Sequence, residues 1–343
     1  RDYSLYQISL DPELVEIGVG IFAEILGKPA FTQIDLERQI ILEEINEDLD
    51  EDGRDINLDD QARKAAFGDH PLGQKITGPS ANVERFTVKD VRRHFARFYA
   101  AKNLIFCVSG PVDRKQVLAA ARRLLGRLQS GELAVTTPPP DMTHGPRCVY
   151  VENPGAQTTA QILFRALPES HPDYVALQAL CRILDDGMST RLHYTLCDQL
   201  GLAYYVSAAL EPFHDTAQLE VDGAAAHAKF AELVTRMLDL VGKMRTTRVL
   251  PTELAKAKRR YRVELASAFD DVDAMAGWYG GTELFYPAPR FEEKVARMEA
   301  VTAADIMRVA RLVLRPERLV VAAAGGLTQK QQREVRRIVR AWR

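Results

Sequence analysis

The stretch TQIDLERQIILEEINEDLDED, residues 32–52, decides how the chain is organised. Its isoleucines and leucines recur at three-, four- and seven-residue intervals, which predicts a helix with one buried stripe. Thr32 or Asp35 stands where a side chain can cap the start of that helix. Glu37 and Glu44 are seven residues apart, so at about 100° per residue they lie nearly in line, at the border of the stripe.

Two interpretations of this acidic helix are open. In the first, the two glutamates belong to a solvated acidic face, together with Glu43, Glu47 and Glu51. In the second, Glu37 and Glu44 have partners, because a carboxylate beside a buried apolar stripe needs a hydrogen-bond donor or a cation. Composition and periodicity do not decide between the two.

The composition limits the class of protein. At 343 residues the chain is long enough for about two domains, and its 46% hydrophobic and 27% charged residues are typical of globular proteins. A net charge of −2 provides no basic field, so we expect neither nucleic acid nor an anionic membrane as a partner. Apolar runs such as residues 319–324 are too short to span a bilayer. The four cysteines, none in a C-x-x-C pair, are expected to be free thiols, which favours a reducing compartment.

The rest of the sequence predicts helices and strands in alternation. Strands are expected at residues 2–10, 104–109, 147–151, 158–165, 202–210, 216–223 and 318–324. Helices are expected at residues 12–26, 59–67, 87–98, 113–128, 172–184, 190–200, 227–243, 251–269, 270–285, 290–300, 303–314 and 330–342. Three consecutive prolines, residues 138–140, predict that residues 131–146 are an extended linker between an N-terminal half, residues 1–130, and a C-terminal half, residues 147–343.

The two halves contain an internal repeat. When they are shifted by 215 positions, the separation of Thr87 and Thr302, the pattern Thr-x-x-Asp recurs at the start of a predicted helix. The same shift places Leu104 on Leu319 and Gly110 on Gly325. Residues 251–269 then correspond to the acidic helix, but they are basic and have no equivalent of its glutamate pair. Only the first half is therefore expected to hold a metal.

LERQIILEEINE, residues 36–47, resembles the segment that carries the third zinc ligand in the pitrilysin/insulinase family, which includes the mitochondrial processing peptidases. Other stretches match that family in the same order: RDYSLYQISL (1–10), FGDHPLGQKITG (67–78), FYAAKNLIFCVSG (98–110), GMSTRLHYTLCDQLGLAYYVSA (187–208) and LVVAAAGG (319–326). The resemblance covers nearly the whole chain. It implies an α+β fold of two homologous halves, each an antiparallel sheet with helices packed on one face.

By this resemblance Glu44 is the zinc ligand, Glu37 is the supporting carboxylate of the catalytic site, and Tyr204 contacts the substrate. Two features depart from the family. The H-x-x-E-H motif is absent, and no histidine has metal-binding spacing: His70, His94, His144, His171, His193, His214 and His227. Since that motif lies upstream of the first strand in the family, and the chain begins with Arg1, we expect an N-terminal piece to be missing. Cys197 also stands where family members usually have an arginine.

A catalytic zinc needs three protein ligands, an open position and a general base, so residues 1–343 cannot complete the site alone. One hypothesis is that the intact protein is a zinc endopeptidase cleaving short or unfolded peptides. The alternative is a non-catalytic subunit that pairs with an active one, and a third hypothesis is a binding scaffold unrelated to proteolysis. Tyr204 either contacts substrate or faces the core, and Cys197 is either a reactive thiol or a packed side chain.

The resemblance also implies the partners. Peptide substrates are expected to bind as an added strand at a sheet edge. The chain is expected to form a homodimer, or a heterodimer with a related family subunit. The reason is that the two halves of one chain usually need a second copy or a partner to enclose a substrate chamber. The expected location is the bacterial cytoplasm or periplasm.

Overall fold

The computed structural model describes residues 2–141 and 145–343. All strands among the described residues lie in the C-terminal half, in one five-stranded sheet of order β1-β5-β2-β4-β3. The strands are β1 (Arg147–Glu152), β2 (Thr158–Ala166), β3 (Val206–Pro212), β4 (Ala217–Ala225) and β5 (Leu319–Gly325). The five strands predicted there are confirmed, although β3 begins four residues later than residue 202.

The sheet is mixed. β1 runs parallel to β5, whereas β2 pairs antiparallel with both β4 and β5, and β3 antiparallel with β4. The expectation of an antiparallel sheet is therefore wrong at one edge. The physical reason is that the chain leaves β1 and reaches β5 only after most of the C-terminal half, and such a long connection permits parallel pairing.

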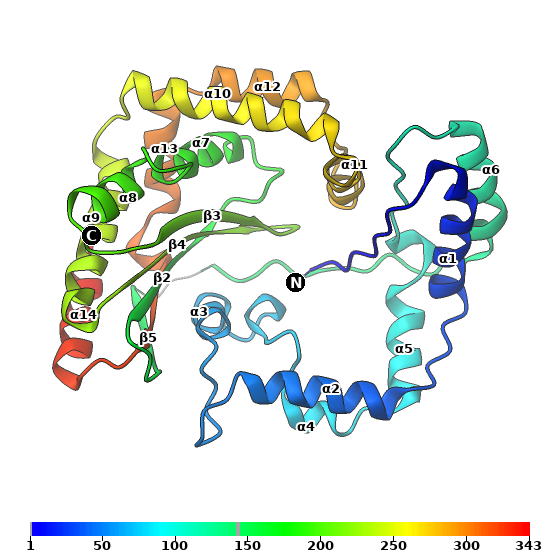
Figure 1. Cartoon of the computed structure of the whole chain (residues 1–343), viewed down its shortest axis with the longest axis horizontal. Helices are drawn as coiled ribbons and strands as arrows, with labels where there is room; N and C mark the ends of the chain where they lie inside the picture. The colour runs from blue at the N-terminus through cyan, green and yellow to red at the C-terminus, as the bar shows by residue number, and fades with distance from the viewer. Residues whose placement is uncertain (1, 142–144) are drawn as a thin grey trace.

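Helices cover one face of the sheet, where the alternating apolar residues of each strand form the core. On β4, Leu219 and Val221 are fully buried in that core, and Gln218, Glu220 and Asp222 lie on the opposite face. Helices α7, α9, α13 and α14 contact the strands, and α10 and α12 contact α7 (Figure 1). The C-terminal helices are α7 (Tyr174–Leu184), α8 (Arg191–His193), α9 (Phe230–Thr246), α10 (Pro251–Ser267), α11 (Val272–Ala276), α12 (Phe291–Ala300), α13 (Ala303–Val313) and α14 (Gln329–Ala341).

Two of the predicted C-terminal helices are not regular. The segment predicted at residues 190–200 is α8 followed by a π-helix, Tyr194–Gln199, and that at residues 270–285 is α11 followed by a π-helix, Gly277–Gly281. The second π-helix contains Gly280, whose Cα–H side lies against Cys107 of the N-terminal half; an added Cβ would be 2.8 Å from the Cys107 Cβ. Glycine is required by that close approach between the halves.

The outer edge of the sheet at β3 is partly closed. The Ala208 N–H, which points away from β4, donates a hydrogen bond of 3.0 Å to the Asp185 carboxylate. Pro212 at the end of the strand has no N–H to offer. These two residues shorten the run of backbone that another strand can pair with.

The N-terminal half is helical in the residues described. Its helices are α1 (Val15–Gly27), α2 (Ile34–Glu47), α3 (Leu58–Phe67), α4 (Ser80–Val83), α5 (Val88–Phe98) and α6 (Arg114–Leu124). α3 packs on the sheet face opposite the C-terminal helices, where Phe67 meets Leu163 and Phe213. α1, α5 and α6 lie away from the sheet, on the right of Figure 1. No described helix is both long and apolar enough to cross a bilayer.

The acidic helix is shorter than predicted. α2 spans residues 34–47 instead of 32–52, and neither Thr32 nor Asp35 caps it: Gln33 occupies the N-cap position without a side-chain hydrogen bond. The helix ends because the Asp50 carboxylate accepts hydrogen bonds from the backbone N–H groups of Asp52 and Arg54, which form a turn.

The strands predicted at residues 2–10 and 104–109 do not form. Both segments are extended, but neither has a ladder partner among the described residues, and an extended segment becomes a strand only when its N–H and C=O groups pair. Their apolar side chains Leu5, Ile8 and Ile105 remain exposed. Alternation of apolar residues was therefore a correct signal for extended backbone and an insufficient one for a sheet.

The internal repeat is visible in the boundaries of the helices. α5 and α13 begin and end 215 positions apart, as do the short 3₁₀ turns Ala101–Asn103 and Pro316–Arg318. Thr87 and Thr302 form capping boxes with Asp90 and Asp305, and their backbone φ/ψ angles are −109°/161° and −109°/164°. The two units therefore share local structure, although residues 104–109 lack the neighbours that make β5 a strand.

The first residues contact the C-terminal half. The His214 N–H donates a hydrogen bond of 2.6 Å to the Asp2 carboxylate, and the ring centroids of Tyr3 and Phe285 are 5.9 Å apart. Ser9 donates a hydrogen bond of 3.1 Å to Asp273 on α11. Figure 1 shows the N-terminal segment running between the two halves.

The predicted linker, residues 131–146, has no regular structure up to residue 141, and residues 142–144, with His144, lie outside the described residues, as does Arg1. The Arg165 guanidinium on β2 holds the proline segment, since it donates hydrogen bonds to the carbonyls of Pro139 and Pro140.

Candidate metal helix and the junction between the halves

α2 is held in place by Arg38. Its guanidinium donates hydrogen bonds to the carbonyls of Val83, at 3.3 Å, and Phe86, at 2.7 Å, and forms an ion pair with Asp35. On the same side, Ile45 is buried. Arg38 therefore fixes the rotation of the helix, and with it the directions in which the glutamates point.

Glu37 lines a cavity of about 310 Å³ at the start of α2. The other lining residues come from the preceding turn and from the α5 region: Phe31, Thr32, Gln33, Ile34, Val88 and Val91. Phe31 has a φ of +52°, a left-handed conformation that is costly for an aromatic residue, and its ring packs edge-on against Phe95 at 5.4 Å. This strained turn gives the cavity its apolar wall next to one carboxylate.

Glu44 lies two turns further along α2 on the same side and is exposed. Among the described residues, neither Glu37 nor Glu44 forms a side-chain hydrogen bond or an ion pair, so both carboxylates are available to other ligands. Glu44 thus fits the part of one oxygen ligand of a metal ion. The described residues do not complete such a site, however, because they contain no group of three His, Cys, Asp or Glu side chains placed to hold a metal.

Tyr204 is 94% exposed and precedes β3, so the alternative of a core-facing strand tyrosine is wrong. No hydrogen bond or ring contact joins it to α2 within the described part of the chain. Cys197 is partly buried within the π-helix Tyr194–Gln199, and burial, followed by the fields of Asp198 and Asp185, raises the pKa of its thiol. A raised pKa disfavours the thiolate, so the structure favours the packed cysteine over the reactive one.

His70 is a loop histidine, as its sequence context suggested. Its Nδ1 accepts a hydrogen bond from the Leu72 N–H at 3.2 Å, and its Nε2 lies 2.7 Å from the Thr137 carbonyl. One ring nitrogen is thus used within the loop after α3, and the other joins that loop to the proline segment.

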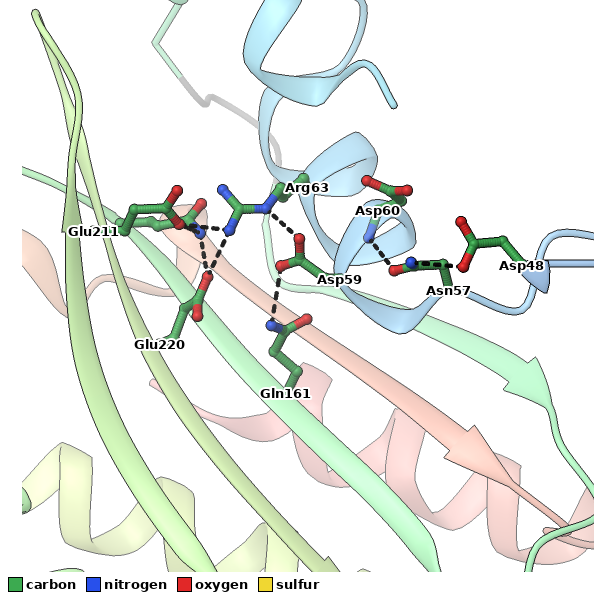
Figure 2. Close-up of polar contacts among 9 residues, drawn as sticks. Asp48, Asn57, Asp59, Asp60, Arg63, Gln161, Glu211 and Glu220 are labelled. Carbon is green, nitrogen blue, oxygen red and sulfur yellow. Dashed lines mark hydrogen bonds and ion pairs between the residues drawn. The ribbon is translucent and has the colours of Figure 1, made fainter. Parts of the chain in front are cut away.

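A polar junction that the sequence analysis did not predict lies where α3 crosses the sheet (Figure 2). Arg63 on α3, only 6% exposed, lies at its centre. The guanidinium forms an ion pair of 2.6 Å with Asp59 on the same helix, of 2.5 Å with Glu211 on β3 and of 3.3 Å with Glu220 on β4. One cation therefore ties the helix to two neighbouring strands.

Two buried glutamines extend the junction. Gln161 on β2 donates a hydrogen bond of 3.3 Å to Asp59 (Figure 2), and Gln218 on β4 donates to Glu211 at 2.8 Å and to Glu220. Burial raises the pKa of Glu220 to about 7 and that of Asp222 to about 6. In both cases neighbouring carboxylates add to the effect of burial.

A second set of contacts connects α2 to α3. The Lys75 ammonium lies 2.7 Å from the Asp48 carboxylate and 3.4 Å from that of Asp55. Asn57, the N-cap of α3, donates to Asp48 at 3.0 Å and accepts from the Asp60 N–H (Figure 2). The candidate metal helix is thereby fixed to the helix that docks on the C-terminal sheet.

Sequence reasoning missed the junction for an identifiable reason. Glu220 and Asp222 alternate with buried Leu219 and Val221, which is the usual pattern of a strand with one solvated face. Nothing in that pattern indicates that a helix from the other half covers the polar face. The available signal was Arg63, a lone arginine between the alanines of an otherwise apolar helix face.

The chain is similar to known proteins in both sequence and structure. The sequence profile described as "Peptidase M16 inactive domain" matches residues 85–261, just over half of the chain. The chain belongs to the peptidase M16 family. This confirms the resemblance to the pitrilysin/insulinase metallopeptidases and the α+β fold class.

Relatives within the M16 family span most of the chain. It is 28% identical over 317 residues to an uncharacterized zinc protease of Mycobacterium leprae, covering 90% of this chain and 70% of that protein. Over 349 residues it is 24% identical to a probable mitochondrial-processing peptidase subunit beta of Schizosaccharomyces pombe, covering 95% and 74%. The crystal structure of a protease from Helicobacter pylori matches with a TM-score of 0.80 at 19% identity, covering 91% of this chain and 77% of that one.

Proposed function

We propose that the intact protein is a zinc-dependent M16 endopeptidase that cleaves short or unfolded peptides. The observation that carries the proposal is Glu44: an exposed carboxylate without a protein partner among the described residues, on the same side of α2 as Glu37 and its cavity. The two histidine ligands and the general base come from an H-x-x-E-H segment upstream of residues 1–343. The name zinc protease carried by relatives supports this assignment.

In this proposal each residue has a distinct role. Bound zinc supplies a Lewis acid and lowers the pKa of a bound water. Glu44 provides one anionic oxygen ligand. Glu37 lies two helical turns before Glu44 and lines the cavity at the start of α2; it orients the ligands and keeps the local charge negative. Tyr204, exposed on the C-terminal half, is free to donate its hydroxyl to a peptide carbonyl.

A non-catalytic role is the second candidate function. The matching family profile is described as an inactive domain, and the described residues contain no complete metal site. In this case the chain pairs with a second copy or with a related active subunit and forms one wall of a peptide-binding chamber. In a homodimer as in a heterodimer, the exposed Tyr204 is available to peptide.

The test uses the full-length parent protein and three matched glutamine variants on one helix. Glu44→Gln keeps the side-chain volume but removes the anionic ligand, so zinc content and peptide turnover should fall together and zinc should not restore them after chelation. Glu37→Gln should lose about 10- to 100-fold in zinc affinity, as is typical when a residue that supports a ligand is changed. Glu43→Gln, also exposed on α2, is the control and should behave like the wild type.

Two results would reject parts of the proposal. If Glu44→Gln binds zinc and cleaves peptides like the wild type, Glu44 is not the ligand. If the parent protein binds no zinc and cleaves no peptide, while it co-purifies in a complex whose second subunit is active, the non-catalytic role replaces the enzymatic one.

A further inference from the structure

The C-terminal helix α14 carries a row of arginines on its exposed side. Four of them recur at intervals of three and four residues and therefore share one face of the helix, here called the arginine face: Arg333, Arg336, Arg337 and Arg340. All four are exposed, and together with Ala341 they line a cavity of about 520 Å³. The buried residues of the helix, Val335 and Val339, lie on its opposite side. Figure 1 shows α14 on the side of the molecule away from α1, α5 and α6, so these helices do not cover the arginine face.

The arginine face has no partner within the described part of the chain. None of its four guanidinium groups forms an ion pair, a hydrogen bond or a ring contact with residues 2–141 or 145–343. Glu334, the single carboxylate of α14, does not pair with them either. Like charges three and four residues apart destabilise a helix. The arginine face therefore costs the isolated helix stability, which points to a role outside the helix.

The internal repeat shows that the fold does not require these arginines. A shift of 215 positions places the start of α14, residue 329, on the start of α6, residue 114. α6 packs on α1 as α14 packs on α9, and these two partner helices also begin 215 positions apart. The residues of the N-terminal half that correspond to the four arginines are Leu118, Ala121, Arg122 and Leu125. The same helix thus forms with a single arginine at these positions.

The arginine face lies next to one edge of the sheet. α14 contacts β1, which is the outermost strand. Burial raises the pKa of the Cys148 thiol on β1, and the fields of Arg336 and Arg340 oppose that rise. These two guanidinium groups are therefore close enough to β1 to act on a group that approaches its edge.

The outer edge of β1 carries backbone groups that are free to pair. The Asn153 N–H, just after the strand, donates a hydrogen bond of 3.3 Å to the Gly325 carbonyl on β5. Because successive residues of a strand point their N–H and C=O groups to alternate sides, those of Cys148, Tyr150 and Glu152 lie on the outer side. Within residues 2–141 and 145–343 no hydrogen bond reaches these outer groups. The opposite edge, at β3, is partly closed, so β1 offers the longer free edge.

We propose that β1 and the arginine face together form a docking site for an acidic, extended segment of a partner protein, which pairs with β1 as an added strand and places carboxylates on Arg336 and Arg340. The free N–H and C=O groups favour a polypeptide over a polynucleotide or a phosphate, because only a peptide backbone can continue the ladder. The guanidinium groups favour carboxylates as the side chains of that segment.

The spacing of the charges fits an alternating sequence. Every second side chain of an extended segment lies on the same face, roughly 6.7 Å from the next. Arg336 and Arg340 are about one helical turn apart, a rise of roughly 6 Å along α14. A segment with an acidic residue at every second position can therefore reach both arginines while its backbone pairs with β1.

The first measurement is a binding titration with the full-length parent protein. The probe is a fluorescent peptide of alternating glutamate and valine, and a chelator is present so that the peptide is not cleaved. Arg336→Gln combined with Arg340→Gln should weaken binding about 4- to 25-fold, since one exposed ion pair typically accounts for about a two- to fivefold change. Arg336→Lys combined with Arg340→Lys keeps both charges and should lose less. Arg122→Gln, exposed on α6 at the position that corresponds to Arg337, is the matched control and should bind like the wild type.

The second measurement locates the bound peptide by amide hydrogen exchange. Residues 147–152 should gain protection when the glutamate–valine peptide binds, because the outer N–H groups of β1 become hydrogen-bonded. Protection of β2 should not change, and it shows in every variant that the sheet is folded. Inorganic polyphosphate is the control ligand: it can bind the arginines but has no peptide backbone, so it should leave exchange in β1 unchanged.

Two results would overturn the docking site. If the wild type does not bind the peptide, or the double glutamine variant binds it as tightly as the wild type, the arginine face does not recognise acidic segments. If binding depends on the arginines but β1 gains no protection, the face attracts negative charge alone and no strand is added. Both measurements are made with zinc removed, so the docking site and the proposed peptidase activity can fail separately.

Discussion

The paired capping boxes provide a quantitative test of the internal repeat. In each box the threonine hydroxyl accepts from the aspartate N–H, at 3.3 Å for Thr87 and 3.2 Å for Thr302, and donates to the aspartate carboxylate at 2.6 Å in both. Replacing either threonine with alanine removes these two hydrogen bonds and should cost about 1 kcal/mol. That free energy corresponds to a roughly fivefold increase in the opening of the helix that the box begins.

The consequences of the two substitutions should differ. α13 buries Ile306, Val309 and Val313 in the main core, whereas α5 has no buried residue. Thr302→Ala should therefore lower the free energy of unfolding of the C-terminal half, measured by urea titration, by about 1 kcal/mol. Thr87→Ala should increase hydrogen exchange in α5 only, and the double variant should show both effects without coupling, as expected for distant sites.

Serine substitutions at the same positions are the matched controls, since serine keeps the hydroxyl and should retain most of the stability. If alanine and serine cost the same, the hydroxyl is not the stabilising group. If Thr87→Ala destabilises α13 as much as α5, the two units are not the independent copies that their matching boundaries indicate.

Three further predictions concern packing and charge. Phe67→Ala, at a 3% exposed position against Phe213, should cost about 3–5 kcal/mol of unfolding free energy, whereas Phe67→Leu should cost much less; equal losses would contradict close packing of α3 on the sheet. Gly325→Ala would place a Cβ 2.8 Å from the Thr158 Cα and should cost about 1–3 kcal/mol, whereas Gly326→Ala, whose nearest neighbour is His227 at 3.4 Å, should be nearly neutral by the same urea titration. The Lys75 hydrogen bond holds the pKa of Asp48 below 3.8. Protection of residues 48–57 from hydrogen exchange should therefore be complete above that pH and lost as the pH falls through the lowered pKa. Asp48→Asn should show no such loss.

The C-terminal half was predictable because its signals are local and agree with one another. β4 alternates apolar and polar residues, Thr302-x-x-Asp305 begins a helix, and Pro251 stands at the first position of α10. In each of these places periodicity, capping and burial point to the same structure. Boundaries there shifted by only a few residues.

The N-terminal half was less predictable because a strand depends on its neighbours. Residues 104–109 and 319–325 have similar sequences, yet only the second is a strand, since β1 and β2 flank it. The end of α2 was also missed, because the turn that follows is held by the Asp50 side chain together with Gly53, whose φ of +75° lies six residues beyond the last helical residue, Glu47.

The candidate site was predictable only in part. The spacing of Glu37 and Glu44 places both on one side of α2 whatever surrounds them. The Phe31 turn, the cavity beside Glu37 and the Arg63 junction arise from contacts between segments far apart in the chain, for example between Arg63 and Glu220. No pattern within a single segment encodes such contacts.

The contacts of the first residues have a consequence for biosynthesis. Tyr3 packs on Phe285, and Ser9 binds Asp273, so these contacts cannot form until nearly the whole C-terminal half has left the ribosome. About 280 residues separate Tyr3 from Phe285. At roughly 5–20 residues per second, Phe285 is therefore synthesised roughly 15–55 s after Tyr3. During that wait Tyr3 lacks its Phe285 partner and Ser9 lacks its Asp273 partner, so the segment is undocked and open to chaperones or to aggregation.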